Sequence, residues 1–262
     1  MTILQAVILG LIQGFSEFLP ISSSGHLVIV ERLLGLTQTS LVFDVGLHMA
    51  TLLSVVLALW GETIQTARNF FSGVKTSLGL KILAATVPVG LVGIFFEDVI
   101  IENARAVWVV AISFIFWGVL LIAADIFARR VKQGNDALQK SSWKQVMAMG
   151  FVQAISLIPG TSRSGITMTA GLFAGMTRET SARVSFLLSI PAIAGAGLVG
   201  LKDVAQFGLD VPILALIVGM ITAAVSGALC IKWLLGVLKK HGFIGFGVYR
   251  IAIGIILLSW FL

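Results

Sequence analysis

The sequence predicts an all-α integral membrane protein with six transmembrane helices and two re-entrant helical hairpins in an inverted-topology repeat. Composition, long apolar runs and two broken polar segments support this prediction. Of the 262 residues, 58% are hydrophobic and 11% are charged, and the mean hydropathy is +1.04. Soluble domains carry about 25% charged residues. The chain therefore lacks the polar coat of a large soluble protein, and we expect one membrane domain over residues 1–262.

Six apolar runs are long enough to cross a bilayer as helices, which takes about 20 residues. Their residues do not alternate between polar and apolar, as the strands of a lipid-exposed barrel would. The expected spans are Val42–Trp60, Ile82–Phe96, Ala106–Ala128, Val184–Leu201, Val211–Leu235 and Ile244–Leu262.

Two further apolar segments, residues 3–36 and 146–176, are short and interrupted. Each reads as a short helix, a break rich in Pro, Gly and Ser, and a second short helix. Irregular backbone at membrane depth is tolerated only inside protein or beside a water-filled cavity. Both segments are therefore predicted to be re-entrant hairpins.

The two broken segments resemble each other. GLIQGFSEFLPISSSG begins at Gly10 and GFVQAISLIPGTSRSG begins at Gly150, an offset of 140 residues. The same offset aligns Gln13 with Gln153, Ser16 with Ser156, Ser22 with Ser162, Ser24 with Ser164 and Gly25 with Gly165. These matches indicate an internal duplication, with one repeat over about residues 1–128 and the other over about residues 143–262.

Basic residues predict the orientation. If the six spans alternate, most Lys and Arg residues of the links, such as Arg129 and Arg130, fall on one side. The positive-inside rule makes that side cytoplasmic. Three spans in each half then invert the second half, so the first hairpin opens outside and the second opens to the cytoplasm. The net charge of +6 is assigned to these links and to anionic lipid rather than to nucleic acid.

The first break, QGFSEFLPISSSGH, is polar within an apolar setting. Gln13 and Glu17 share one helix face at i and i+4. Burying Glu17, His26 and Arg163 without partners would cost several kcal/mol. We therefore expect these three residues to compensate one another where the hairpins meet.

The second break, PGTSRSGIT, is suited to an anion. Arg163 offers a planar fork for phosphate oxygens, and the helix that starts near Ser164 offers free N–H groups. The SSSGH turn of the first break offers similar hydroxyls. The predicted phosphate-binding residues are Ser22, Ser24, Ser162, Arg163, Ser164 and Thr167.

These residue types support chemistry on phosphate or diphosphate. Ser23 or His26 could be the nucleophile, and the sequence leaves that choice open. Arg163 would neutralise the phosphate oxygens. Glu17 could act as base, or could hold a divalent cation, Mg²⁺ or Ca²⁺, together with Gln13.

Structural roles are the competing interpretation of the same residues. Ser and Gly in membrane helices usually serve packing. His48, one turn after Asp44, is interpreted as a hydrogen-bonded structural residue. Arg250 either pairs with an acid or contacts the substrate.

The two motifs resemble the signatures of a known family. QGFSEFLPISSSGH resembles the first signature of the undecaprenyl-diphosphate phosphatases, also called bacitracin-resistance phosphatases, and PGTSRSGIT resembles the second. The resemblance covers essentially the whole chain. It implies hydrolysis of undecaprenyl diphosphate to undecaprenyl phosphate in the bacterial inner (plasma) membrane, which recycles the lipid carrier for cell-wall synthesis and confers bacitracin resistance. It also implies a divalent cation and the same arrangement of six spans and two hairpins.

The resemblance also implies residue roles. Glu17, Ser23 and His26 match active-site positions, and Ser162, Arg163 and Thr167 match positions that bind or stabilise phosphate. Gln13 departs from the pattern, since the family often has a second glutamate there. A metal that needs two carboxylates would be weakened at this site unless Asp44 supplied the other charge, so Gln13 is given only a supporting role.

A secondary transporter or lipid-phosphate flippase is the alternative function, because inverted repeats with broken helices are typical of transporters. The two readings differ in that a carrier needs no nucleophile. The expected partners are a polyprenyl diphosphate lipid and the bilayer. The oligomeric state is left open, with a homodimer as one alternative.

Overall fold

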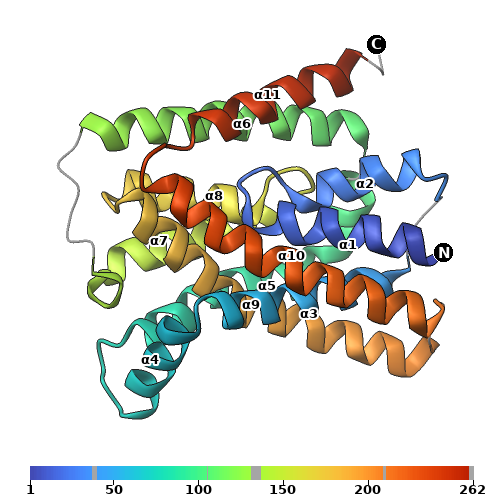
Figure 1. Cartoon of the computed structure of the whole chain (residues 1–262). Helices are drawn as coiled ribbons and strands as arrows, with labels where there is room; N and C mark the ends of the chain where they lie inside the picture. Colours follow the sequence, from blue (N-terminus) through green and yellow to red (C-terminus); the bar gives the residue numbers. More distant parts are fainter. Residues whose placement is uncertain (37–39, 105, 131–136, 209–210, 260–262) are drawn as a thin grey trace.

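The computed structural model describes residues 1–36, 40–104, 106–130, 137–208 and 211–259, and within these ranges all regular secondary structure is helical (Figure 1). The elements are α1 (Ile3–Phe18), α2 (Ser23–Leu33), α3 (Leu41–Ala58), α4 (Trp60–Phe71), α5 (Leu78–Ala104), α6 (Val107–Arg130), η1 (Leu138–Lys140), α7 (Trp143–Gln153), η2 (Ala154–Leu157), α8 (Arg163–Phe173), α9 (Arg178–Phe207), α10 (Ile213–Leu238) and α11 (Ile244–Ser259).

Five helices are long and apolar enough to cross a membrane by length and composition: α3, the first parts of α5 and α9, α6 and α10. The sixth expected span corresponds to α11, which has 16 residues and ends at Ser259. Residues 260–262 of that expected span lie outside the described part of the chain. By this criterion the described residues hold five of the six expected spans.

The first expected span, Val42–Trp60, extends beyond the C-terminal end of the helix that forms it. The α3 helix ends at Ala58, and Trp60 begins a separate helix, α4, that the sequence analysis did not predict. Leu59 separates the two helices, since its backbone (φ −114°, ψ 38°) is not helical. At 12 residues α4 is too short to span a bilayer.

Both predicted helix–break–helix segments are present. The first hairpin is α1 and α2, and the second is α7 with η2 followed by α8. A capping box starts each hairpin: the side chains of Thr2 and Ser142 accept from the backbone N–H groups of Gln5 and Gln145, whose side chains bond back to the caps. The two starts are 140 residues apart.

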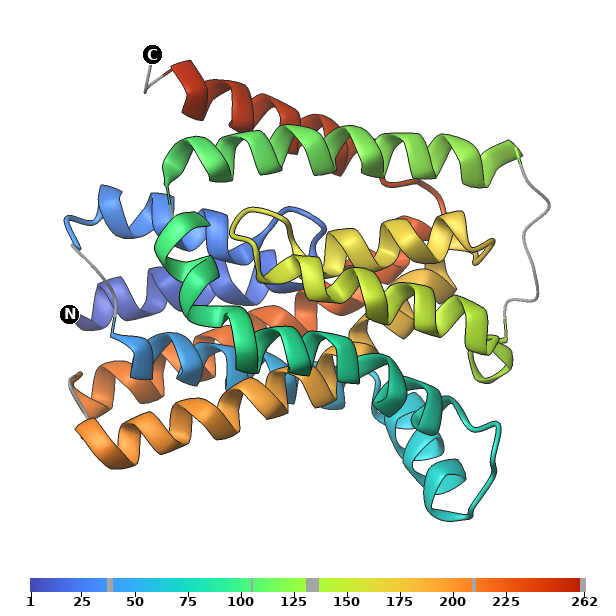
Figure 2. The same cartoon turned by 180° about the vertical axis from the view of Figure 1, so that it is seen from behind.

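Each hairpin packs on a long helix of the other half of the chain. The α1 helix lies along α10, whereas α7 lies along α5, and α6 lies beside α11 (Figures 1 and 2). Glycines permit the close approach, because a Cβ atom on Gly10 would meet the carbonyl oxygen of Gly219, and one on Gly150 would meet that of Ala85. The interlocked packing brings both breaks to the centre of the molecule.

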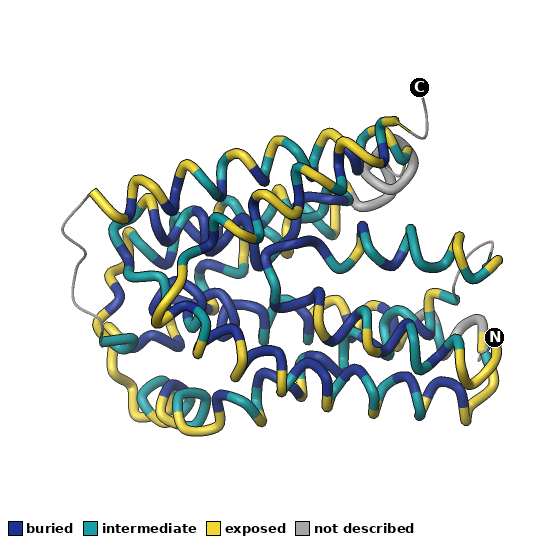
Figure 3. The backbone as a smooth tube through the Cα atoms, turned by 45° about the horizontal axis from the view of Figure 1, so that its top comes forward, coloured by how far each residue is buried: buried dark blue, intermediate teal, exposed yellow. Residues whose placement is uncertain are grey.

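Buried residues line the contacts between helices (Figure 3). Many of the exposed residues on the outside are large and apolar. Ile94, Phe95 and Leu198 are each more than 70% exposed, at 74%, 71% and 71%. Monomeric soluble proteins rarely expose extensive apolar surface. This outer surface is suited to contact with lipid tails.

Candidate active site

The two breaks contact each other directly. Arg163, the first residue of α8, donates from Nη2 to Glu17 Oε1 at 2.6 Å. Ser164 Oγ donates to the backbone carbonyl of Leu19 in the first break at 2.9 Å. These bonds confirm that the motifs, far apart in the sequence, form one cluster.

Glu17 is the centre of this cluster and is only 7% exposed. Its Oε2 atom accepts from Ser23 Oγ at 2.6 Å and from Gln13 Nε2 at 3.2 Å, and His48 Nε2 lies 3.9 Å away. Arg163 supplies the positive charge that a buried carboxylate needs. The expectation that Glu17 and Arg163 compensate each other is confirmed.

The helix start after each break has the same unusual backbone. Ser22 (φ 76°) and Ser162 (φ 72°) are the two non-glycine residues with positive φ in the described chain. The Oγ atom of each accepts from the backbone N–H three residues later, at 3.4 Å from Gly25 and 3.1 Å from Gly165. Left-handed backbone costs roughly 1–2 kcal/mol for such residues and tends to cluster at functional sites.

His26 is placed differently from the expectation. Its Nδ1 atom lies 2.7 Å from the carbonyl oxygen of Ser22, and its Nε2 atom lies 2.7 Å from the hydroxyl of Tyr249 in α11. The two rings are stacked, with centroids 5.7 Å apart. The prediction that His26 compensates Glu17 is wrong, because the bond to Ser22 turns its ring toward α11. His48 faces Glu17 instead.

The predicted phosphate-binding hydroxyls divide into two groups. Ser24 is exposed, and its Oγ atom lies 3.3 Å from that of Ser22. Ser164 bonds Leu19 as described, while Thr167 Oγ1 donates to the carbonyl of Arg163 at 2.8 Å and lies 2.7 Å from Ser185 Oγ. The latter two hydroxyls brace α8 here, and phosphate binding by any of them stays a prediction.

Arg250 has a role that neither sequence interpretation included. Its side chain is fully buried in α11 and donates to backbone carbonyls of both breaks, at Pro20 (3.3 Å) and Gly160 (2.8 Å). It also donates to Ser113 and Phe114 of α6, at 3.3 and 3.4 Å. The two break carbonyls are again 140 residues apart. Arg250 therefore fastens the breaks to each other and to α6.

The oxygen atoms near Glu17 are of the kind that bind Mg²⁺ or Ca²⁺. Gln13 Oε1, one helical turn before Glu17, is buried and has no hydrogen-bond partner among the residues that the structure describes. The described residues hold no cluster of three or more His, Cys, Asp or Glu side chains able to bind a metal. Glu17 and Gln13 thus fit a cation that takes its remaining ligands from water and substrate.

The sequence did not predict how four residues surround the site. It named His48 and Arg250 without placing them beside Glu17 and the break carbonyls, and it did not indicate Tyr249 or Ser185. One signal was available for two of them. Tyr249 is the only tyrosine of the chain and stands beside an arginine in an apolar helix. Partners more than 200 residues apart, such as His26 and Tyr249, leave no local pattern.

Comparison with known proteins shows the family of the chain. The family model described as "Bacitracin resistance protein BacA" matches residues 6–256. "Undecaprenyl-diphosphatase" of Elusimicrobium minutum is 43% identical over 262 residues, covering 98% of each chain. "Undecaprenyl-diphosphatase 2" of Stutzerimonas stutzeri is 38% identical over 268 residues, covering 100% of this chain and 99% of the relative. With its apolar helices and this full-length match, the chain is a multi-pass membrane protein that belongs to the bacitracin resistance protein BacA family.

Proposed function

We propose that the chain hydrolyses undecaprenyl diphosphate to undecaprenyl phosphate and inorganic phosphate. The family and the names of its relatives support this activity. The observation that carries it is the contact of Ser23 and Arg163 with the two oxygens of Glu17. This contact joins a nucleophile (Ser23), a base (Glu17) and a guanidinium group that can bind phosphate (Arg163). The reaction recycles a lipid carrier for cell-wall synthesis and would confer bacitracin resistance.

Ser23 is the proposed nucleophile and Glu17 the proposed base. A bound diphosphate replaces Glu17 as the partner of Arg163, which frees Glu17 to accept a proton. Ser23 Oγ attacks the terminal phosphorus, its proton passes to Glu17, and the bond from that phosphorus to the bridging oxygen breaks as undecaprenyl phosphate leaves. Arg163 neutralises the phosphate oxygens in this step.

Water completes the reaction. It attacks the phosphorus of phosphorylated Ser23, the serine oxygen takes back its proton from Glu17, and the released phosphate keeps the protons of the water. His26 is the alternative nucleophile, although its ring nitrogens bond Ser22 and Tyr249. Substrate labelled in the terminal phosphate distinguishes the two: label stable in acid and lost in alkali indicates phosphoserine, and the reverse indicates phosphohistidine.

A divalent cation, Mg²⁺ or Ca²⁺, is part of the proposal. The Oε1 atom of Gln13, which has no partner among the described residues, and Glu17 Oε1, which Arg163 releases, would hold it beside the diphosphate, and Glu17 Oε2 would stay with Ser23 as the base. The cation would supply further charge neutralisation for the phosphate oxygens. Activity that chelator removes and either cation restores is the expected result.

The proposed membrane arrangement has six spans and two re-entrant hairpins in inverted repeats, with α11 as the sixth span. Features 140 residues apart support it, including the positive φ of Ser22 and Ser162 and the packing of α1 on α10 and of α7 on α5. We place the chain in the bacterial inner membrane with the first hairpin open to the outside. A cysteine at the exposed Ser24 should react with an impermeant reagent from outside, and the native Cys230 is buried. Labelling from the cytoplasm alone would overturn this orientation.

Phosphate release from undecaprenyl diphosphate by purified protein in detergent tests the activity. We expect wild-type protein to release phosphate only when a divalent cation is present. The control variant Arg130→Ala should do the same, because Arg130 lies outside the site. Folded wild-type protein that releases no phosphate with any cation would contradict the enzyme and favour the transporter or flippase. The short Ser23–Glu17 bond favours the enzyme, because a carrier needs no activated hydroxyl.

A further inference from the structure

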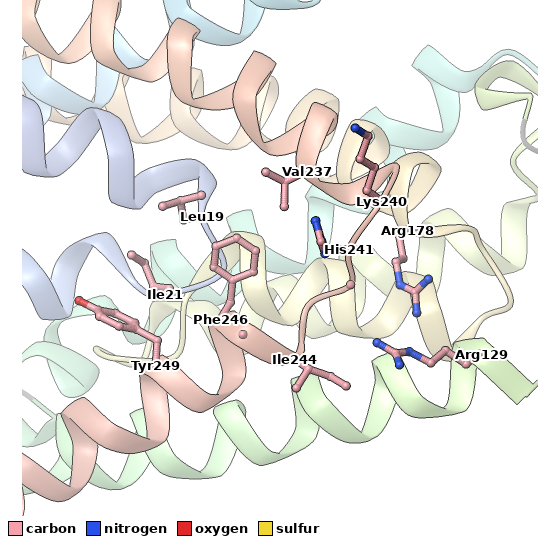
Figure 4. A pocket seen from close by; sticks show the side chains of 12 residues that line it. Leu19, Ile21, Arg129, Arg178, Val237, Lys240, His241, Ile244, Phe246 and Tyr249 are labelled. Atoms are coloured by element: carbon pink, nitrogen blue, oxygen red, sulfur yellow. The ribbon is translucent and has the colours of Figure 1, made fainter.

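A cavity of about 940 Å³ lies beside the site, between the ends of α6 and α10 and the starts of α9 and α11 (Figure 4). We call it the α6–α11 groove. Small-molecule sites commonly measure about 300–1,000 Å³. One end is formed by Leu19 and Ile21 of the first break, and Phe246 lies along the middle. The side chains of Arg129 and Arg178 face each other at the opposite end.

The basic end carries more positive charge than its own carboxylate balances. Arg178 Nε donates to Asp125 Oδ1 at 2.6 Å and Arg129 Nη2 donates to Asp125 Oδ2 at 3.2 Å, so one fully buried carboxylate serves two guanidinium groups. Arg178 Nη2 is buried without a hydrogen-bond partner in the described structure. Lys240 and His241 line the same cavity. Buried donors of this kind are nearly always satisfied, so Arg178 Nη2 has room for a further acceptor, which the oxygen of an anion would supply.

We propose that the α6–α11 groove binds a lipid with a single phosphate head. The head lies between Arg129 and Arg178, where guanidinium forks suit phosphate oxygens. The apolar tail lies along Phe246 toward Leu19. A free phosphate ion would leave these apolar walls without a contact, whereas a phosphorylated polyprenyl chain fills both ends.

The position of the groove suits this ligand. Its basic end lies where the ends of α6 and α10 meet the start of α9, and in the proposed membrane arrangement helix ends lie near lipid head groups. Its apolar end is lined by Leu19 and Ile21, which lie between Glu17 and Ser23 in the sequence. The groove lies apart from the Glu17–Arg163 pair, so its occupancy does not depend on the proposed catalytic function. Binding and hydrolysis can be tested separately.

The test measures the binding of undecaprenyl phosphate to the purified chain in detergent, with Arg163→Lys present throughout to weaken phosphate binding beside Glu17 without leaving that carboxylate unpaired. Adding Arg129→Gln should weaken binding at least tenfold. Arg130→Gln, one residue later and outside the groove lining, should leave binding within about twofold. Equal binding by the two variants would overturn the proposal.

A steric pair gives an independent readout. Gly245 lines the groove, and a Cβ atom there would meet nothing within 4 Å. Gly236 in α10 is equally open and does not line it. Gly245→Phe should fill the tail path and weaken lipid binding at least tenfold, whereas Gly236→Phe should not. If Arg129→Gln fails to fold, the comparison of Gly245→Phe with Gly236→Phe tests the proposal, and equal lipid binding by these two variants would overturn it.

Two further ligands identify what the groove recognises. Inorganic phosphate should bind at least a hundredfold more weakly than undecaprenyl phosphate. Undecaprenol, which has no phosphate, should bind Arg129→Gln as well as it binds the protein with Arg129. Inorganic phosphate that binds as tightly as the lipid would indicate a simple anion site. Undecaprenol that binds as tightly as its phosphate would indicate an apolar groove without head-group recognition. Either result overturns the proposal.

Discussion

Ser23 and Arg163 hold the same place in the two halves of the chain and bind the two oxygens of one carboxylate. Each is the first residue of the helix after a break, and the two are 140 positions apart. Ser23 Oγ donates to Oε2 of Glu17 and Arg163 Nη2 donates to Oε1, both at 2.6 Å. The same turn geometry thus places a hydroxyl group, that of Ser23, beside Glu17 in the first repeat and a guanidinium group, that of Arg163, beside it in the second.

Glu17→Gln should abolish most catalysis. The amide cannot accept the Ser23 proton, and general bases typically contribute about 10²–10⁴-fold in rate. Phosphate release measured at saturating substrate and cation should fall by that factor. Activity within about threefold of wild type would exclude Glu17 as the base.

Arg163→Lys and Arg163→Ala should separate charge from geometry. Arg163 also donates from Nη1 to the carbonyl of Ser185 at 3.2 Å, a second bond that an ammonium group at Glu17 would not make. Lysine should keep most stability but lower activity at least tenfold, since it lacks the planar fork. Alanine should destabilise the protein by about 3–5 kcal/mol, because it leaves a buried carboxylate unpaired. Unfolding in detergent and phosphate release, measured on the same preparations, check both effects.

Ser162→Gly should be less destabilising than Ser162→Ala. Both substitutions remove the cap on Gly165, which costs about 1 kcal/mol, but glycine also relieves the left-handed backbone at φ 72°. The expected difference in unfolding free energy is about 1 kcal/mol in favour of glycine. Equal stabilities would show that the backbone at this turn carries no strain.

Arg250→Leu should destabilise the protein by at least about 3 kcal/mol. It removes the donor for four backbone carbonyls, and each buried acceptor left unpaired costs about 1–3 kcal/mol. The exposed Arg130→Leu should change the unfolding free energy by less than about 0.5 kcal/mol. An Arg250→Leu protein as stable as this control would contradict the role of Arg250 in holding the two breaks together.

Local patterns predicted the features that depend on local sequence. Apolar runs located the long helices, and the repeated Gly, Gln and Ser spacing located both breaks. The pairing of Glu17 with Arg163 followed from the cost of burying either residue alone.

The features that were missed depend on tertiary packing. Arg250 bonds carbonyls, which every residue has, so no sequence partner marks it. His26 pairs with a tyrosine 223 residues away. The α4 helix was not predicted because its 12 residues are amphipathic rather than apolar throughout. Trp60 was assigned to the preceding span and the residues after it to a link.

A double-mutant cycle on phosphate release tests most directly the claim that the two breaks form one catalytic unit. Glu17→Gln, Arg163→Ala and the double variant would be compared with wild type under one cation. Residues that act as a unit are strongly non-additive, so the double variant should be no more than about threefold slower than the worse single variant. Losses that multiply would show that Glu17 and Arg163 act independently and would contradict the account.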